Sequence, residues 1–104
     1  MDKITQSSTK KKAKELIKSK EIRNRIKLSV AAYAYEKVNE PIMNDNEFDN
    51  LSKLINTKIR TGKRKLDKFF RDNFEPDSGI WINKHPELYK IEYIYKKYYR
   101  KDEL

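Results

Sequence analysis

The chain has 104 residues, which indicates a single domain with a modest core. Lys and Arg number 25 against 16 Asp and Glu, giving a formal net charge of +9, and the chain has one histidine and no cysteine. These counts exclude disulfides, thiolate metal sites and most metal or general-base schemes that depend on histidine.

The charge is divided unevenly along the chain. Residues 1–30 carry ten Lys or Arg against three acidic residues, whereas residues 31–50 carry one Lys against five acidic residues. The first part includes a basic N-terminal segment, residues 1–21. A basic flank beside an acidic centre predicts two different surfaces on one small protein.

The first predicted helix ends near Pro41. Ser8 or Thr9 is the expected N-cap, and the residue before a proline avoids the helical region, so the helix should end there. Apolar residues recur at helical spacing between these limits. They are Ile22, Ile26, Val30 and Tyr33.

A second helix is predicted to begin after Asn44. Asn44 is a suitable N-cap, and Glu47 three residues later would complete a capping box. Gly62 is the expected end of this helix. One face should be apolar, formed by Phe48, Leu51, Ile55 and Ile59.

The C-terminal helices are expected within residues 63–104. One apolar face consists of Leu66, Phe69, Phe70 and Phe74. Pro86 fits the first position of a last helix, whose shared face would hold Leu88, Ile91, Tyr95 and Tyr98. Ile80-Trp81-Ile82 is the one short β-like run. The pattern therefore predicts an all-α fold of about four helices in a single domain, residues 1–104.

The segment from Tyr33 to Leu51 carries the most specific signal in the chain. It resembles the N-terminal helical domain (domain Ia) of bacterial NAD-dependent DNA ligases, and the likeness extends to stand-alone ligase-related small proteins of bacteriophages. The likeness implies a helical hairpin over about residues 22–61. The matching positions, without a gap, are Tyr33, Tyr35, Pro41, Asp45, Glu47, Phe48, Asp49 and Leu51.

This resemblance implies a site for nicotinamide mononucleotide, the nicotinamide half of NAD. By likeness, Tyr35 and Phe48 are the stacking pair, and Asp45 and Asp49 supply polar contacts. Such a role is chemically reasonable, because an aromatic face attracts a cationic ring and carboxylates accept hydrogen bonds from ribose hydroxyls or a carboxamide. A capped helix whose Phe48 simply belongs to the core remains the alternative.

Two residues depart from the family pattern. Glu36 stands where the family has a histidine, and Phe48 replaces a tyrosine, which keeps the ring and loses the hydroxyl. Glu36 adds a negative charge where substrate phosphates would approach. The departure at Glu36 is therefore expected to weaken binding of an intact dinucleotide.

Catalysis is not expected. The run Lys65-Leu66-Asp67-Lys68 imitates the start of the lysine motif of ligases, but it lacks the glycine and falls in a helical pattern. With two glycines and one histidine, the chain also has no glycine-rich phosphate loop and no Ser-His-Asp arrangement. No metal cofactor is expected either.

Two other functions remain open at the level of sequence. Lys63, Arg64 and Lys65 lie in a basic helical segment that would attract phosphate backbones. The tyrosines near the C-terminus could stack bases, namely Tyr89, Tyr93, Tyr95, Tyr98 and Tyr99. A third possibility is an adaptor that docks on a host protein, such as a host ligase.

The chain is expected to be cytoplasmic and to have no membrane partner. No apolar run approaches the length of a membrane span, and the N-terminus lacks the apolar core of a signal peptide. The last four residues spell a retention signal of the endoplasmic reticulum, which would need a secretory signal to be read.

Overall fold

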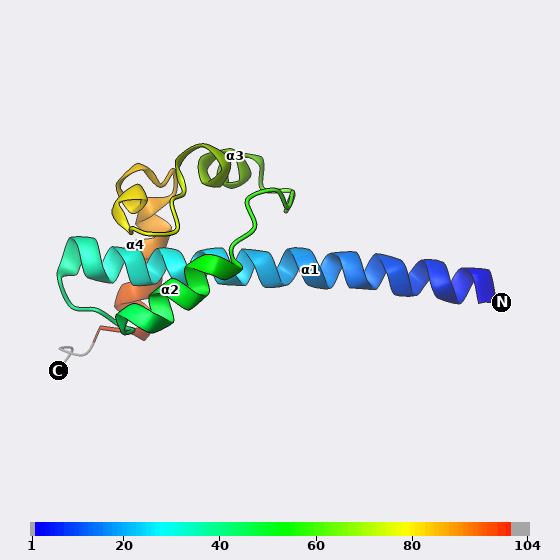
Figure 1. Ribbon diagram of the computed structural model, residues 1–104, viewed down its shortest axis with the longest axis horizontal. Helices are drawn as coiled ribbons and strands as arrows, with labels where there is room; N and C mark the ends of the chain where they lie inside the picture. Colours follow the sequence, from blue (N-terminus) through cyan, green and yellow to red (C-terminus); the bar gives the residue numbers. More distant parts are fainter. Residues whose placement is uncertain (1, 101–104) are drawn as a thin grey trace.

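The computed structural model describes residues 2–100, and the side chains of residues 11–100. The elements in chain order are α1 (Asp2–Tyr33), the π-helical turn η1 (Ala34–Val38), α2 (Asp45–Leu54), α3 (Arg64–Asn73), the 3-10 helix η2 (Ile80–Lys84) and α4 (Leu88–Tyr98). The described residues form four α-helices and no strand, which confirms the all-α prediction (Figure 1).

Helix α1 is the axis of the molecule. Its 32 residues span about 48 Å at the usual helical rise, against a longest dimension of 56 Å for the whole molecule. The other elements gather around its C-terminal half, while its N-terminal half projects away from them (Figure 1). Residues 11–20 are all exposed, and burial starts at Glu21.

The start predicted for this helix is wrong. It begins at Asp2, so Ser8 and Thr9 lie inside it instead of capping it. No glycine or proline occurs between residues 2 and 33, and the lysines that follow Thr9 are good helix formers. The helix therefore continues through two residues that would otherwise make good caps.

The core is an aromatic cluster packed on α1. Phe70 of α3 is 2% exposed, and its ring centroid lies 5.5 Å from that of Trp81 and 5.8 Å from that of Phe74. Burying a side chain of this size contributes about 1.5–3 kcal/mol. The other core members are Leu28, Val30, Ala32, Tyr33, Ala34, Phe69, Ile82, Ile91 and Tyr95.

A buried ion network joins α1 to α3. Arg25 Nε donates to Glu21 Oε2 at 2.7 Å, and Arg25 Nη1 donates to Asp67 Oδ1 at 2.8 Å, with all three side chains almost fully buried. Arg25 Nη2 also donates to the backbone carbonyls of Asn56 and Ile59, at 3.0 and 3.1 Å. One guanidinium thus holds together α1, α3 and the loop that precedes α3.

This network explains why α2 is shorter than predicted. The helix ends at Leu54, not near Gly62, and Ile55 has extended backbone angles. The Asn56 N–H donates to Glu21, and the Asn56 carbonyl accepts from Arg25. These backbone groups find partners on α1 instead of in a continued helix. Gly62 has a φ of +92° in the loop that follows, a conformation that favours glycine.

The C-terminal part also differs in detail from prediction. The β-like run Ile80-Trp81-Ile82 forms the start of η2 and buries Trp81 and Ile82. The Trp81 indole N–H donates to the Ser78 carbonyl at 2.6 Å, which closes a compact turn. Pro86 lies two residues before α4 and not at its first position. Within the described residues, no helix has the length and apolar content needed to cross a membrane.

Candidate ligand-binding site

The π-helical turn after α1 presents Tyr35 and Glu36 to solvent. The turn closes at Asn39, whose φ of 62° is left-handed and whose N–H donates to the Ala34 carbonyl. Asparagine tolerates this conformation better than most residues. π-turns of this kind are common at functional sites because they turn side chains away from the helical register. Tyr35 is accordingly 54% exposed, directly after the buried Ala34.

The first turn of α2 is fixed by the predicted capping box. Asn44 Oδ1 accepts from the Glu47 N–H at 2.8 Å, and Glu47 Oε1 accepts from the Asn44 N–H at 3.2 Å. Both bonds confirm the expectation from sequence. Asp45 and Asp49 follow from this fixed start, one helical turn apart, so both lie on the same face.

A third segment closes the site from the side of η2. Gly79 is buried against α1, where a Cβ on this residue would lie 3.3 Å from Ala32 Cβ and 3.6 Å from Glu36 Cγ. A side chain here would be in tight contact with Ala32, so a residue without one suits this close approach of the turn to α1. Asp77 and Ser78 thereby line the same cavity as Tyr35 and Glu36.

These three segments line one cavity that is open to solvent, which we call the acidic cavity. Its volume of about 370 Å³ falls within the range of small-molecule sites. The four residues that the resemblance assigns as ligand contacts, and Glu36 beside them, all line this cavity. The lining consists of Ala31, Tyr35, Glu36, Pro41, Met43, Asp45, Phe48, Asp49, Asp77, Ser78 and Gly79.

The acidic cavity is negative inside a positively charged protein. Four carboxylates line it and none of its lining residues is basic. In the described part of the chain, no three Asp, Glu or His side chains come together as metal ligands, so the carboxylates are spread around the cavity. A cationic or hydrogen-donating ligand fits this environment, and a free phosphate does not.

Phe48 serves both the core and the cavity. It is half-buried and packs against the aromatic core from its edge, and it also lines the acidic cavity. Tyr35 lines the same cavity from a different element and is 54% exposed. The two interpretations of Phe48 at the level of sequence, core residue and ligand contact, are therefore compatible.

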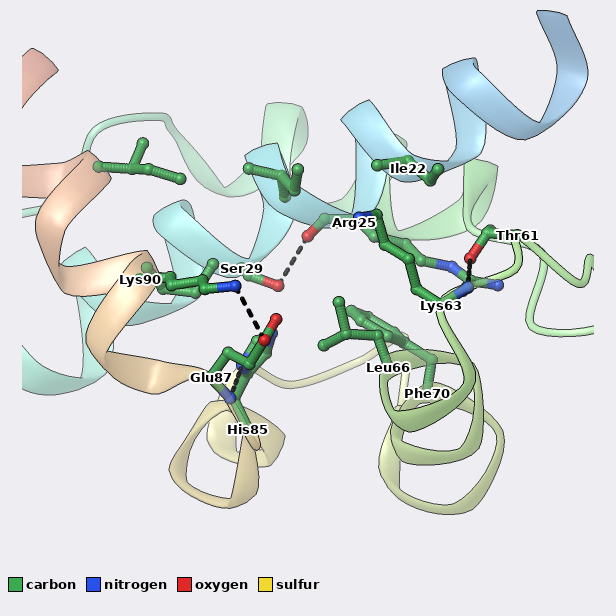
Figure 2. A pocket seen from close by; sticks show the side chains of 13 residues that line it. Ile22, Arg25, Ser29, Thr61, Lys63, Leu66, Phe70, His85, Glu87 and Lys90 are labelled. Carbon is green, nitrogen blue, oxygen red and sulfur yellow. Dashed lines mark hydrogen bonds and ion pairs between the residues drawn. The ribbon is translucent and has the colours of Figure 1, made fainter. Parts of the chain in front are cut away.

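A second, smaller cavity lies between α1, α3 and α4, and we call it the apolar cavity (Figure 2). Its volume of about 150 Å³ is below the range of small-molecule sites. The Glu87 carboxylate at its rim accepts from Lys90 Nζ at 3.0 Å, and Arg25 is committed to the ion network. The apolar cavity is thus best described as a gap in the packing of three helices.

The single histidine of the chain lines the apolar cavity. His85 Nδ1 accepts from the Glu87 N–H at 3.0 Å, and the ring meets Phe69 edge-on at 5.1 Å between centroids. Burial lowers the pKa of His85 to about 4, although the nearby Glu87 carboxylate acts in the opposite direction. The imidazole is therefore neutral at pH 7 and acts as a packed hydrogen-bond acceptor.

The three residues predicted to bind nucleic acid do not line one common cleft. Lys63 lines the apolar cavity, while Arg64 lines a separate cleft on the outer side of α3. Lys65 is exposed near Glu87 and helps to lower the pKa of that carboxyl, after the hydrogen bond and charge of Lys90. Successive residues of a helix point about 100° apart, which separates these neighbours.

The sequence missed the contribution of the turn before η2. Nothing in the order of Asp77, Ser78 and Gly79 indicates that they line a cavity together with residues 35–49. Their compact turn chemistry was the one available signal. Comparison of the chain with protein-family models, curated proteins and solved structures found no match.

Proposed function

We propose that this protein is a non-catalytic binder of the nicotinamide end of NAD, and that the ligand occupies the acidic cavity. One observation supports this most: Tyr35, Glu36, Asp45, Phe48 and Asp49 come from two elements and line one cavity of suitable size. The resemblance of residues 33–51 to the ligase Ia domain led to four of these residues, all except Glu36, independently of any structure.

The nicotinamide ring would lie against the aromatic side chains. In nicotinamide nucleotides this ring is a pyridinium cation, and a cation gains about 0.5–2 kcal/mol over an aromatic face, depending on its solvation. Tyr35 is exposed and available for such contact, and Phe48 is held in place by the core. One ring is thus rigid and the other adjustable.

The carboxylates would receive the donor groups of the ligand. Asp45 and Asp49 lie on one face of α2, and carboxylates accept hydrogen bonds from ribose hydroxyls and from the carboxamide N–H. Asp77 adds a third acceptor from another segment. All of these charges also favour the pyridinium ring electrostatically.

The phosphate of nicotinamide mononucleotide is the unfavourable part of the ligand. No basic side chain lines the acidic cavity, and Glu36 lies beside Tyr35 where the family has a histidine. Like charges brought close together repel each other. The site should therefore prefer nicotinamide riboside, which keeps the cation and the ribose but has no phosphate.

Replacing Glu36 by histidine tests this assignment of charges. Glu36→His should tighten binding of nicotinamide mononucleotide by about two- to fivefold, the scale of an exposed charge interaction, and should leave nicotinamide riboside unchanged or weaker. Isothermal titration or ligand-observed NMR gives both constants. Glu40→His makes the same change at an exposed residue outside the cavity lining and serves as the matched control.

The ratio of the two affinities is the decisive quantity. A Glu36→His protein that binds both ligands as the wild type does would show that the phosphate does not approach Glu36. If Glu40→His tightened binding equally, the change in affinity would result from the net charge of the protein and not from the position of Glu36. Either result contradicts the proposed orientation of the ligand.

A further inference from the structure

A basic cleft opens on the outer side of α3, away from the residues of the acidic cavity. Its volume is about 720 Å³, and it lies between α3 and the loop that Arg25 holds against α1. Arg64, Lys68 and Arg71 follow the spacing of one helical face. We call the set of Lys58, Arg60, Arg64, Lys68 and Arg71 the basic cleft.

The positive charge of this cleft is largely uncompensated. The one carboxylate that lines it, Asp67, is already neutralised by Arg25 and by the backbone and hydroxyl of Thr61. Lys68 pairs with Asp72 at 3.0 Å, but both side chains are more than half exposed, so the pair is weak. The other four cations make no side-chain hydrogen bond or ion pair among the described residues.

The projecting half of α1 continues the basic surface. Lys11, Lys14 and Lys18 lie three and four residues apart, so they form one stripe. Arg25 follows Lys18 by two helical turns on the same face and points at Asp67 of α3. By this spacing the lysine stripe faces the side of α1 on which Arg25 reaches α3.

The projecting half of α1 is stabilised little by contacts with the rest of the chain. Residues 11–20 bury none of their side chains, and isolated helices of this length are only marginally stable in water. The exposed surface is rich in lysine and contains two apolar residues, Leu16 and Ile17. A polyanion would complement it.

We propose that the basic cleft and the lysine stripe together bind double-stranded nucleic acid through its phosphate backbone, without sequence preference. The Glu21–Arg25–Asp67 network fixes the angle between the two parts, so they act as one preformed surface. A duplex presents phosphates along two strands, which matches cations spread over two elements.

The absence of aromatic residues favours a duplex over a single strand. None of the residues that line the basic cleft is aromatic, and single strands are usually held by base stacking on aromatic rings. The exposed tyrosines of α4, including Tyr89, Tyr93 and Tyr98, lie outside this lining. Contacts here are thus ionic, and they should respond strongly to salt.

The test is a salt titration of duplex binding with the complete chain, followed by fluorescence anisotropy. From about 50 to about 200 mM salt, the logarithm of the association constant should fall linearly with the logarithm of salt concentration. The double variants Arg64→Gln/Arg71→Gln and Lys14→Gln/Lys18→Gln should each reduce the slope by about 1.8, the value for two lost phosphate contacts.

Lys37→Gln/Lys84→Gln is the matched control, since it removes two exposed charges outside both parts of the surface. Its slope should stay that of the wild type. All substituted side chains are exposed, and circular dichroism checks that the fold is kept. Failure to bind a duplex at low salt would overturn the proposal. So would an equal effect of the control, or tighter binding of a single strand that is lost in Tyr93→Ala/Tyr98→Ala.

Discussion

Replacing Arg25 by methionine should destabilise the protein by about 3–5 kcal/mol, the cost of leaving buried charges without a partner. The substitution would strand the carboxylates of Glu21 and Asp67 and the backbone carbonyls of Asn56 and Ile59. It would also remove a guanidinium that lies 5.1 Å from the centre of the Phe70 ring. A loss of this size is a large part of the stability of a small domain.

Urea denaturation measures the effect, and Lys68→Met is the matched control. Lys68→Met also leaves a carboxylate, that of Asp72, without its partner. This ion pair is exposed, so its loss should lower the free energy of unfolding by less than about 1 kcal/mol. The triple variant Glu21→Gln/Arg25→Met/Asp67→Asn removes all three buried charges and should be more stable than Arg25→Met alone. Equal, small losses for Arg25→Met and Lys68→Met would contradict a structural role for the network.

Acid should destabilise the protein from about pH 6.5 downward, through His85. Burial lowers the pKa of this imidazole from 6.5 to about 4 in the folded state, so the unfolded chain binds the proton more readily. Stability is complete above the unfolded pKa and declines as the pH falls toward 4. The expected loss is about 3 kcal/mol for a pKa difference of this size.

Protonation of Asp67 should extend the loss of stability to lower pH. Burial alone would raise the pKa of this carboxyl, but hydrogen bonds from Thr61 and Arg25 outweigh burial and lower it. The ionised form is therefore favoured in the folded state. This contribution is present above the unfolded pKa near 4 and is lost as the pH falls through the lower folded value.

Two measurements distinguish the contribution of His85 to the pH dependence of stability from that of the carboxyl groups. His85 is the only histidine, so its imidazole resonances give the folded pKa directly. His85→Asn keeps an acceptor for the Glu87 N–H but removes the titrating imidazole. The stability of this variant should therefore vary little between pH 7 and pH 5. A histidine that titrates near 6.5, or a variant as sensitive as the wild type, would contradict this account.

The sequence predicted the start of α2 because this start depends on local chemistry. The capping box needs only Asn44 and Glu47, three residues apart, and the structure contains both of its hydrogen bonds. Once the start of the helix is fixed, the positions of Asp45 and Asp49 follow from helical geometry. Short-range rules were sufficient for this part of the protein.

Long-range contacts decided what the sequence could not predict. The end of α2 depends on Glu21 and Arg25, more than thirty residues earlier, which capture the backbone at Asn56 and Ile59. The local pattern of apolar residues does not indicate that these contacts compete with continuation of the helix. The β-like run at residues 80–82 formed a 3-10 helix for the same kind of reason, because Trp81 and Ile82 are buried in the core.

The same limit applies to the acidic cavity and the basic cleft. Asp77 and Gly79 join the acidic cavity only through the close approach of their turn to Ala32. Lys63 and Arg64, adjacent in sequence, face different cavities. The basic cleft instead collects cations from the loop before α3 and from one face of α3, a grouping that depends on how Arg25 positions that loop.

Chemical-shift mapping with nicotinamide mononucleotide and nicotinamide riboside tests the proposed binding site most directly. Both ligands should shift the resonances of Tyr35, Asp45, Phe48 and Asp49 together, with a dissociation constant on the order of a millimolar, or about −4 kcal/mol. Asp49→Asn should weaken binding with helicity unchanged, whereas Asp72→Asn, the same substitution outside the cavity lining, should not. Silence of these four residues at ligand concentrations well above a millimolar, or equal shifts over the whole surface, would contradict the proposal that the acidic cavity binds nicotinamide.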